Sequence, residues 1–124
     1  MKLYHELNET EFEDMCYFCT QLERDETNID YSIFITCKPY YSKEIPYLMV
    51  FPSNIRYIDM NKDTFYAQIS IEDKNVYYNN LLSTTDILNI NKFIDTNKEV
   101  ILNYWDIYET DYSTTELCAN IIKN

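Results

Sequence analysis

The most reactive side chains in this chain are four cysteines and one histidine. Cys16 and Cys19 form a CxxC pair, whereas Cys37 and Cys118 are isolated. A redox CxxC places its first thiol at a helix N-terminus, where the dipole lowers the thiol pKa, but this pair is predicted two turns inside a helix, on its apolar face. We therefore predict reduced core cysteines, with a four-thiolate zinc site as the alternative. His5 has no cysteine or histidine at ligand spacing, so we expect it at the surface.

Paired carboxylates are the other groups that can do chemistry. They occur at Glu72-Asp73, at Asp25-Glu26 and among Asp106, Glu109 and Asp111. A pair with separated pKa values can serve as general acid and base. Turn and helix-end positions explain these residues as well, and no nucleophile has a base or a metal cluster beside it. We predict no catalytic residue, no metal and no cofactor; a small metal- or carboxylate-dependent enzyme is the alternative.

The composition favours one folded domain. The chain has 124 residues, of which 46% are hydrophobic and 16% aromatic, enough to fill one core. Glycine is absent, which excludes glycine-rich phosphate loops because their tight turns need a residue without a Cβ. No apolar run approaches the roughly 18 residues of a membrane span, and no secretion signal is present. We therefore expect a cytoplasmic protein with no membrane contact.

The acidic charge is concentrated at the two ends of the chain. The net charge is −11, and residues 1–30 alone hold nine acidic and two basic side chains. Such a field repels nucleic-acid phosphates and attracts basic surfaces. We predict a basic protein as partner and no direct nucleic-acid binding; the alternative is that the acid only keeps the protein in solution.

The first element that must position these groups is a helix over residues 8–24. Asn8 and Glu11 form a capping box, and Leu7 can pack on Phe12. One face of this helix is apolar, and it consists of Phe12, Met15, Cys16, Cys19 and Leu22. The acidic residues Glu9, Glu13 and Asp14 lie elsewhere on it, which gives the helix an acidic outer surface that we expect to end near Arg24.

Five strand candidates follow, and they indicate an antiparallel meander because short polar turns join them. Their ranges are Tyr31 to Lys38, Tyr47 to Phe51, Ile55 to Met60, Thr64 to Ile71 and Val76 to Tyr78. Several tyrosines fall opposite the buried positions, which predicts a partly exposed aromatic face of the sheet.

Helical patterns return near the C-terminus. Ser83 and Asp86 form a cap, and the apolar stripe that follows lapses at Asn97 before resuming up to Trp105. Thr96 and Glu99 repeat the capping signal, so we predict a break or kink near Thr96, with Trp105 as a core anchor. Ser113 and Glu116 give a further helix-start signal, so a last helix is expected after Ser113, with Leu117, Cys118 and Ile121 facing inward.

The order of these elements predicts an α+β fold: an antiparallel sheet of three to five strands with an N-terminal helix and C-terminal helices packed on it. We expect a single domain over residues 1–124, with an acidic N-terminal helix in 1–30, strands in 31–80 and helices in 81–124.

Several segments resemble a widespread group of small bacterial domains of unknown function. They are AQISIED at Ala67 to Asp73, the Asn97-Lys98-Glu99 and Leu102 to Asp106 segments, Thr110-Asp111 and Glu116-Leu117. The resemblance covers about residues 31 to 122. It implies small two-gene loci of the toxin and antitoxin kind. Members often carry a histidine-rich strand, but residues 39–50 here (PYYSKEIPYLMV) contain no histidine, so no role of those histidines carries over.

The leading functional hypothesis is a non-catalytic, inhibitor or antitoxin-like module that binds a basic protein. The residues predicted to bind the partner are acidic residues of the first helix and tyrosines of the sheet: Glu9, Glu13, Asp14, Tyr40, Tyr41, Tyr66 and Tyr78. A specific form is a phage-encoded, nucleic-acid-mimicking antagonist of a bacterial defence nuclease. A self-associating structural subunit is a further alternative, and the oligomeric state stays open.

Overall fold

The computed structural model describes residues 6–17, 19–37, 45–107 and 112–124, and for residues 14–17 it describes the backbone alone. Its elements, in chain order, are α1 (Glu9–Tyr17), β1 (Cys19–Leu22), α2 (Arg24–Thr27), β2 (Tyr31–Thr36), β3 (Tyr47–Pro52), the 3-10 helix η2 (Tyr57–Asp59), β4 (Ala67–Ser70), β5 (Val76–Asn79), α3 (Thr84–Trp105) and α5 (Thr114–Asn120).

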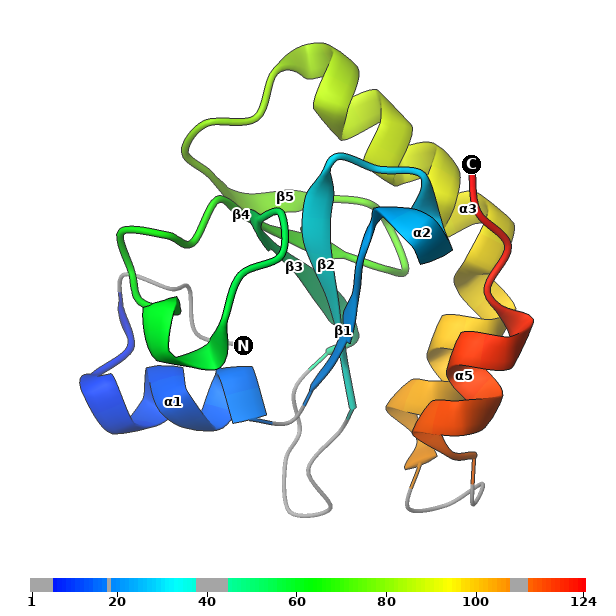
Figure 1. Cartoon of the computed structure of the whole chain (residues 1–124), viewed down its shortest axis with the longest axis horizontal. Coiled ribbons are helices and arrows are strands. Elements are labelled where there is room, and N and C mark those ends of the chain that lie inside the picture. The colour runs from blue at the N-terminus through cyan, green and yellow to red at the C-terminus, as the bar shows by residue number, and fades with distance from the viewer. Residues whose placement is uncertain (1–5, 18, 38–44, 108–111) are drawn as a thin grey trace.

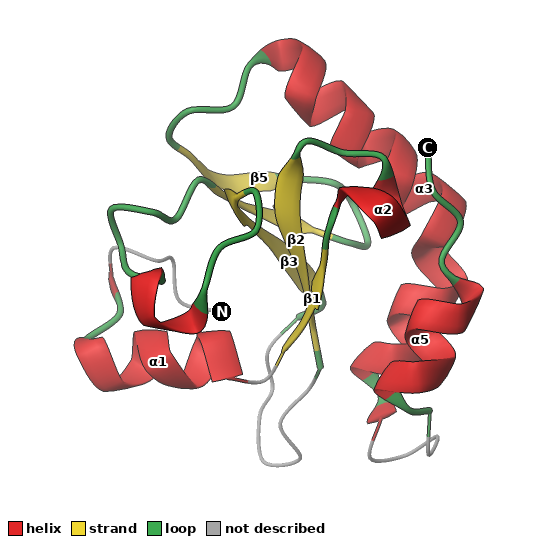
Figure 2. Ribbon diagram, in the orientation of Figure 1, coloured by secondary structure: helices red, strands yellow, loops and turns green. Residues whose placement is uncertain are grey.

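The five strands form one antiparallel sheet in the order of the chain, β1-β2-β3-β4-β5. The register aligns a row of small and branched apolar residues across four strands, namely Leu22, Ile33, Val50 and Ala67. Helices lie on both sides of the sheet, as Figures 1 and 2 show. The predicted α+β class and the antiparallel meander are therefore confirmed.

Both faces of the sheet are covered, and each has its own apolar core. The α3-side core joins the sheet to α3 and α5; its largest members include Leu22, Ile33, Ile35, Leu48, Ile69, Ile90, Phe93 and Ile101. The α1-side core consists of Phe12, Phe34, Tyr47, Met49, Phe51, Ile55 and Phe65. Because large side chains point to both faces, the central strands are apolar on both sides, and β2 and β3 are buried almost throughout.

The first helix is shorter than the sequence predicted. It ends at Tyr17, and Cys19–Leu22 forms the edge strand β1 instead of two further helical turns. The pairing of Cys19 with Thr36 and of Leu22 with Ile33 supplies backbone hydrogen bonds that the helical pattern could not reveal. The apolar positions of a short segment can fit both the helical and the strand period, and here the pairing with β2 determines that the segment is a strand.

The predicted strand over Ile55 to Met60 is also wrong. Tyr57–Asp59 forms a 3-10 turn, closed by hydrogen bonds from Asp59 N to Arg56 O and from Met60 N to Tyr57 O. The Arg56 guanidinium pairs with the Asp59 carboxylate at 2.9 Å across this turn. Only Ile55 of this segment is buried, where it joins the α1-side core.

The predicted break near Thr96 does not exist, since α3 runs without interruption over 22 residues. The axis of α3 does change direction along its length, as Figure 1 shows. The lapse in its apolar stripe has another cause. Asn97 is 1% exposed, and its amide donates to Phe93 O at 3.0 Å and to Ile122 O at 2.8 Å and accepts from Ile122 N at 2.7 Å. A buried polar residue thus joins the helix to the segment that follows α5.

The ends of the C-terminal helices match the sequence prediction in part. The Ser83 hydroxyl accepts from Asp86 N, and the Asp86 carboxylate accepts in return from Ser83 N, which is the predicted capping box. The Ser113 hydroxyl likewise accepts from Glu116 N at the start of α5. Leu117 is buried as predicted, but Cys118 is exposed, so its inward placement was wrong.

Replacing Asp86 with alanine is expected to lower the free energy of unfolding by about 1–2 kcal/mol near neutral pH, because the cap and a 3.0 Å hydrogen bond from the Tyr31 hydroxyl are lost. Burial raises the pKa of Asp86, but hydrogen bonds from Ser83 and Tyr31 outweigh it, so the folded-state pKa lies below its ordinary value of 3.8.

A lowered folded-state pKa gives stability that is fully present above the unfolded-state pKa and is lost as the pH falls through the folded-state pKa. Urea denaturation should therefore show the difference between wild type and Asp86→Ala shrinking below about pH 4. A difference that stays constant at pH values well below 4 would contradict the assignment.

None of the helices in the described ranges combines the length and the apolar character that crossing a bilayer requires.

Candidate partner-binding site

The first wall of the candidate site is α1. Its N-terminus is fixed by the predicted capping box, in which the Asn8 side chain accepts from Glu11 N at 2.8 Å and Asn8 N donates to the Glu11 carboxylate at 3.3 Å. Phe12 is buried and meets the Phe65 ring edge to face at 6.0 Å between centroids. With this side chain turned inward, Glu9 and Glu13 lie one turn apart and are both exposed.

The second wall is η2 and the residue after it. Tyr57 and Ile58 are 61% and 77% exposed, although both are large and apolar. Met60 follows them and packs partly against the α1-side core. An Asx turn then holds the chain, because the Asn61 side chain accepts from Asp63 N at 2.8 Å.

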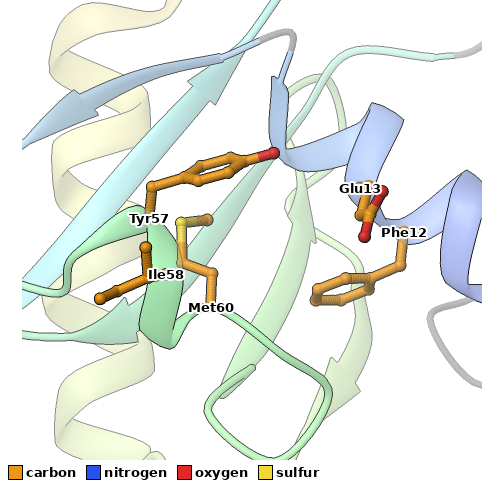
Figure 3. Close-up of a pocket in the computed structure, with 5 residues that line it drawn as sticks. All are labelled: Phe12, Glu13, Tyr57, Ile58 and Met60. Carbon is orange, nitrogen blue, oxygen red and sulfur yellow. The ribbon is translucent and has the colours of Figure 1, made fainter.

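These two walls enclose a hollow of about 190 Å³ lined by Phe12, Glu13, Tyr57, Ile58 and Met60. Figure 3 shows that Phe12 and Glu13 come from α1 and that Tyr57, Ile58 and Met60 come from the opposite side. The hollow is mainly apolar and has one carboxylate at its margin. Such a combination suits an apolar side chain that has a cation beside it.

Two basic side chains described near η2, Arg56 and Lys62, form contacts within the chain. Arg56 pairs with Asp59. The Lys62 ammonium donates to Leu7 O, which links the turn after η2 to the residues before α1. Within the described part of the chain, neither Glu9 nor Glu13 forms an ion pair, so their charges face solvent.

Several other acidic side chains have structural roles, as the turn and helix-end interpretation predicted. The Glu23 carboxylate accepts from the Ser32 hydroxyl, at 2.6 Å to Oε2, and from Asn54 N at 2.8 Å, where it joins β1, β2 and the turn after β3. Hydrogen bonds from the backbone of Asn75 lower the pKa of Asp73, as in a turn. A lowered pKa is the opposite of what a general acid needs, so Asp73 is not suited to that role.

Of the remaining predicted partner-binding residues, the structure describes the side chains of Tyr66 and Tyr78, and both pack against the apolar cores. Tyr66 is half-buried in the α3-side core, with its ring edge on Tyr31 at 5.9 Å. The ring of Tyr78 packs against that of Phe65, with 5.5 Å between the centroids, so Tyr78 is part of the α1-side core. The side chain of Asp14, and Tyr40 and Tyr41 entirely, lie outside the described residues. Among the described residues, Tyr66 and Tyr78 therefore pack in different cores and do not share one exposed face of the sheet.

The described cysteines lie in three different environments. Cys19 is in β1, Cys37 is buried at the end of β2, and Cys118 is exposed on α5 beside Glu26. Within the described ranges, no group of three histidine, cysteine or acidic residues can hold a metal ion. The side chain of Cys16 and all of His5 lie outside those ranges.

A group of hydroxyls and one thiol, buried except for the exposed Thr114, lies where β1, β2, α3 and α5 meet. The Tyr104 hydroxyl is 2.6 Å from the Thr20 hydroxyl, which is 3.4 Å from that of Thr114. Burial raises the pKa of Tyr104, and it also raises the pKa of the Cys37 thiol despite a hydrogen bond with Tyr104. Both groups are therefore protonated at neutral pH, which is the state of packing residues and not of a nucleophile.

Sequence reasoning missed Tyr57, Ile58 and Met60 as site residues because it placed them in a strand. A signal was present: only two residues separate Arg56 and Asp59, the spacing at which opposite charges meet across a single turn. Asn54, with φ of 56°, marks a left-handed turn just before the segment.

Comparisons of the chain with protein-family models, with curated proteins and with solved structures found no match. The resemblance to small bacterial domains in two-gene loci stays a prediction from the sequence motifs.

Proposed function

We propose that this chain is a non-catalytic, inhibitor or antitoxin-like binding module that engages a basic protein surface through α1 and the hollow beside it. The observation that carries the proposal is that the exposed Glu13 lines the same hollow as the exposed apolar residues Tyr57 and Ile58, with the exposed Glu9 one turn earlier on α1. Neighbouring exposed apolar and charged groups are typical of a surface that binds another protein.

The energetics of α1 support this proposal. Like charges four residues apart destabilise a helix by about 0.2–0.5 kcal/mol, and Glu9 and Glu13 have this spacing with no ion pair in the described residues to offset it. A net charge of −11 adds to the repulsion. A basic partner would relieve both terms, and it would be steered toward this part of the molecule during association.

Reversing both charges, in the double variant Glu9→Lys and Glu13→Lys, is expected to weaken binding to the native basic partner about ten- to hundredfold. The salt dependence of binding should fall as well, because fewer charge pairs remain to be screened. The partner would first be captured with wild-type protein and then titrated calorimetrically at two salt concentrations.

A matched control has the same net charge. Glu72→Lys with Glu99→Lys reverses two exposed charges, one after β4 and one on α3, away from α1. This control should lose far less affinity than the α1 variant. Equal losses in the two double variants would mean that only total charge matters, and unchanged affinity in both would overturn the proposal.

A further inference from the structure

We infer that the hollow between α1 and η2 is an anchor pocket for one apolar side chain of the partner, flanked in the partner by lysine or arginine. The inference rests on the proposed function and specifies the chemistry of the segment that binds. It concerns the hollow lined by Phe12, Glu13, Tyr57, Ile58 and Met60.

The size of the hollow fits a single side chain. With a volume of about 190 Å³, the hollow has room for one leucine, methionine or phenylalanine side chain. Apolar side chains from both walls would surround the guest, because Phe12 comes from α1 and Met60 from the opposite side. Burial of one such side chain contributes a large part of the affinity of a small interface.

The charges around the hollow favour a basic residue of the partner beside its apolar side chain. Glu13 is at the margin, and Glu9 lies one turn earlier on α1. Two cations of the described residues, which lie close to η2 in the chain on either side of it, are engaged elsewhere, Arg56 with Asp59 and Lys62 with Leu7 O. The exposed ring of Tyr57 can also form a cation–π contact with a cation of the partner. A lysine or arginine of the partner is therefore attracted by both Glu13 and Tyr57.

The same charges disfavour a second copy of this chain as the occupant. The exposed Ile58 could enter the hollow of another molecule, but this contact would bring α1 of one copy close to the acidic residues of the other. With a net charge of −11 on each copy, repulsion opposes such a dimer. A basic partner segment has the complementary sign.

The test uses full-length protein with carbon-13 in its methionine methyl groups and a short amphipathic peptide of leucine and lysine as the probe. Addition of the peptide is expected to shift the Met60 methyl resonance, which a Met60→Leu variant assigns. One matched peptide has serine in place of leucine, and another has glutamate in place of lysine. Each of these should bind at least about tenfold more weakly.

Protein variants separate the pocket from general charge attraction. Ile58→Ser and Glu13→Lys should each weaken binding of the leucine–lysine peptide by about tenfold. Their controls are Leu88→Ser, which changes a residue of α3 that is also 62% exposed, and Glu99→Lys. Both control variants should bind like wild type. Ile58 and Glu13 are exposed, so neither variant is expected to lose its fold, and thermal unfolding of each checks this.

The outcomes distinguish the two proposals. If the serine and leucine peptides bind equally, or if Glu99→Lys weakens binding as much as Glu13→Lys, the anchor pocket is wrong but attraction of a basic partner stands. If the glutamate peptide binds as well as the lysine peptide, the charge basis of the proposed function fails too. Absence of binding by the leucine–lysine peptide, or a concentration-dependent dimer that Ile58→Ser abolishes, would also overturn the inference.

Discussion

Replacing Trp105 with alanine is expected to lower the free energy of unfolding by about 3–5 kcal/mol, the largest effect predicted for this protein. Trp105 is the last residue of α3 and is only 6% exposed. Its ring lies 6.3 Å from that of Tyr47, whose strand, β3, is the central strand of the sheet. Removing the indole would leave a cavity between the end of the helix and the sheet, and the loss would appear as a lower urea midpoint.

A matched control on the same helix is Leu88→Ala, because Leu88 is 62% exposed and its truncation should change stability by less than about 0.5 kcal/mol. Trp105→Phe should recover part of the loss. If Trp105→Ala left stability unchanged but abolished partner binding, the assignment of this residue as a core anchor would be wrong.

Replacing Asn97 with alanine is expected to cost about 2–3 kcal/mol, because three hydrogen bonds are lost and the Ile122 amide and carbonyl lose their partner. The effect should also be local. Asn97 is the residue that ties α3 to the segment after α5, so the Ile122 amide should exchange with solvent much faster in the variant while amides of the sheet change less.

The variant Asn97→Leu gives the sharper comparison. The periodicity of α3 alone would predict a gain in stability, because leucine completes the apolar stripe. The structure predicts a loss, since leucine cannot bond to Ile122. Thr96→Ala, next to it on the exposed side, should have a small effect and serves as the control. Equal stability of Asn97→Leu and wild type would show that the link to Ile122 is unimportant.

Trp105 and Asn97 both belong to α3, whereas the hollow lies beside α1 on the other side of the sheet. The α3 side is held by Trp105, Asn97 and the α3-side core. The α1 side carries the exposed Glu13 and Ile58 over a smaller aromatic core. Changes on the α3 side are therefore expected to act on stability, and changes around the hollow on binding.

The sequence alone determined the features that depend on residues close together in the chain. The capping pairs Asn8 with Glu11, Ser83 with Asp86 and Ser113 with Glu116 were predicted, and each hydrogen-bonds as expected. The strands β2, β3 and β5 were also placed correctly, since turn residues bound them. A cap or a turn involves about four successive residues, so their identities suffice to specify it.

Tertiary structure decided the features in which residues distant in the chain meet. Cys19–Leu22 became a strand because β2 pairs with it, and Asn97 is buried within an uninterrupted helix because Ile122 bonds to it. The candidate site likewise combines a feature that the sequence predicted with one that depends on tertiary structure. The acidic residues of α1 could be read from the sequence, but the hollow could not, because it exists only where packing brings Phe12 next to Met60.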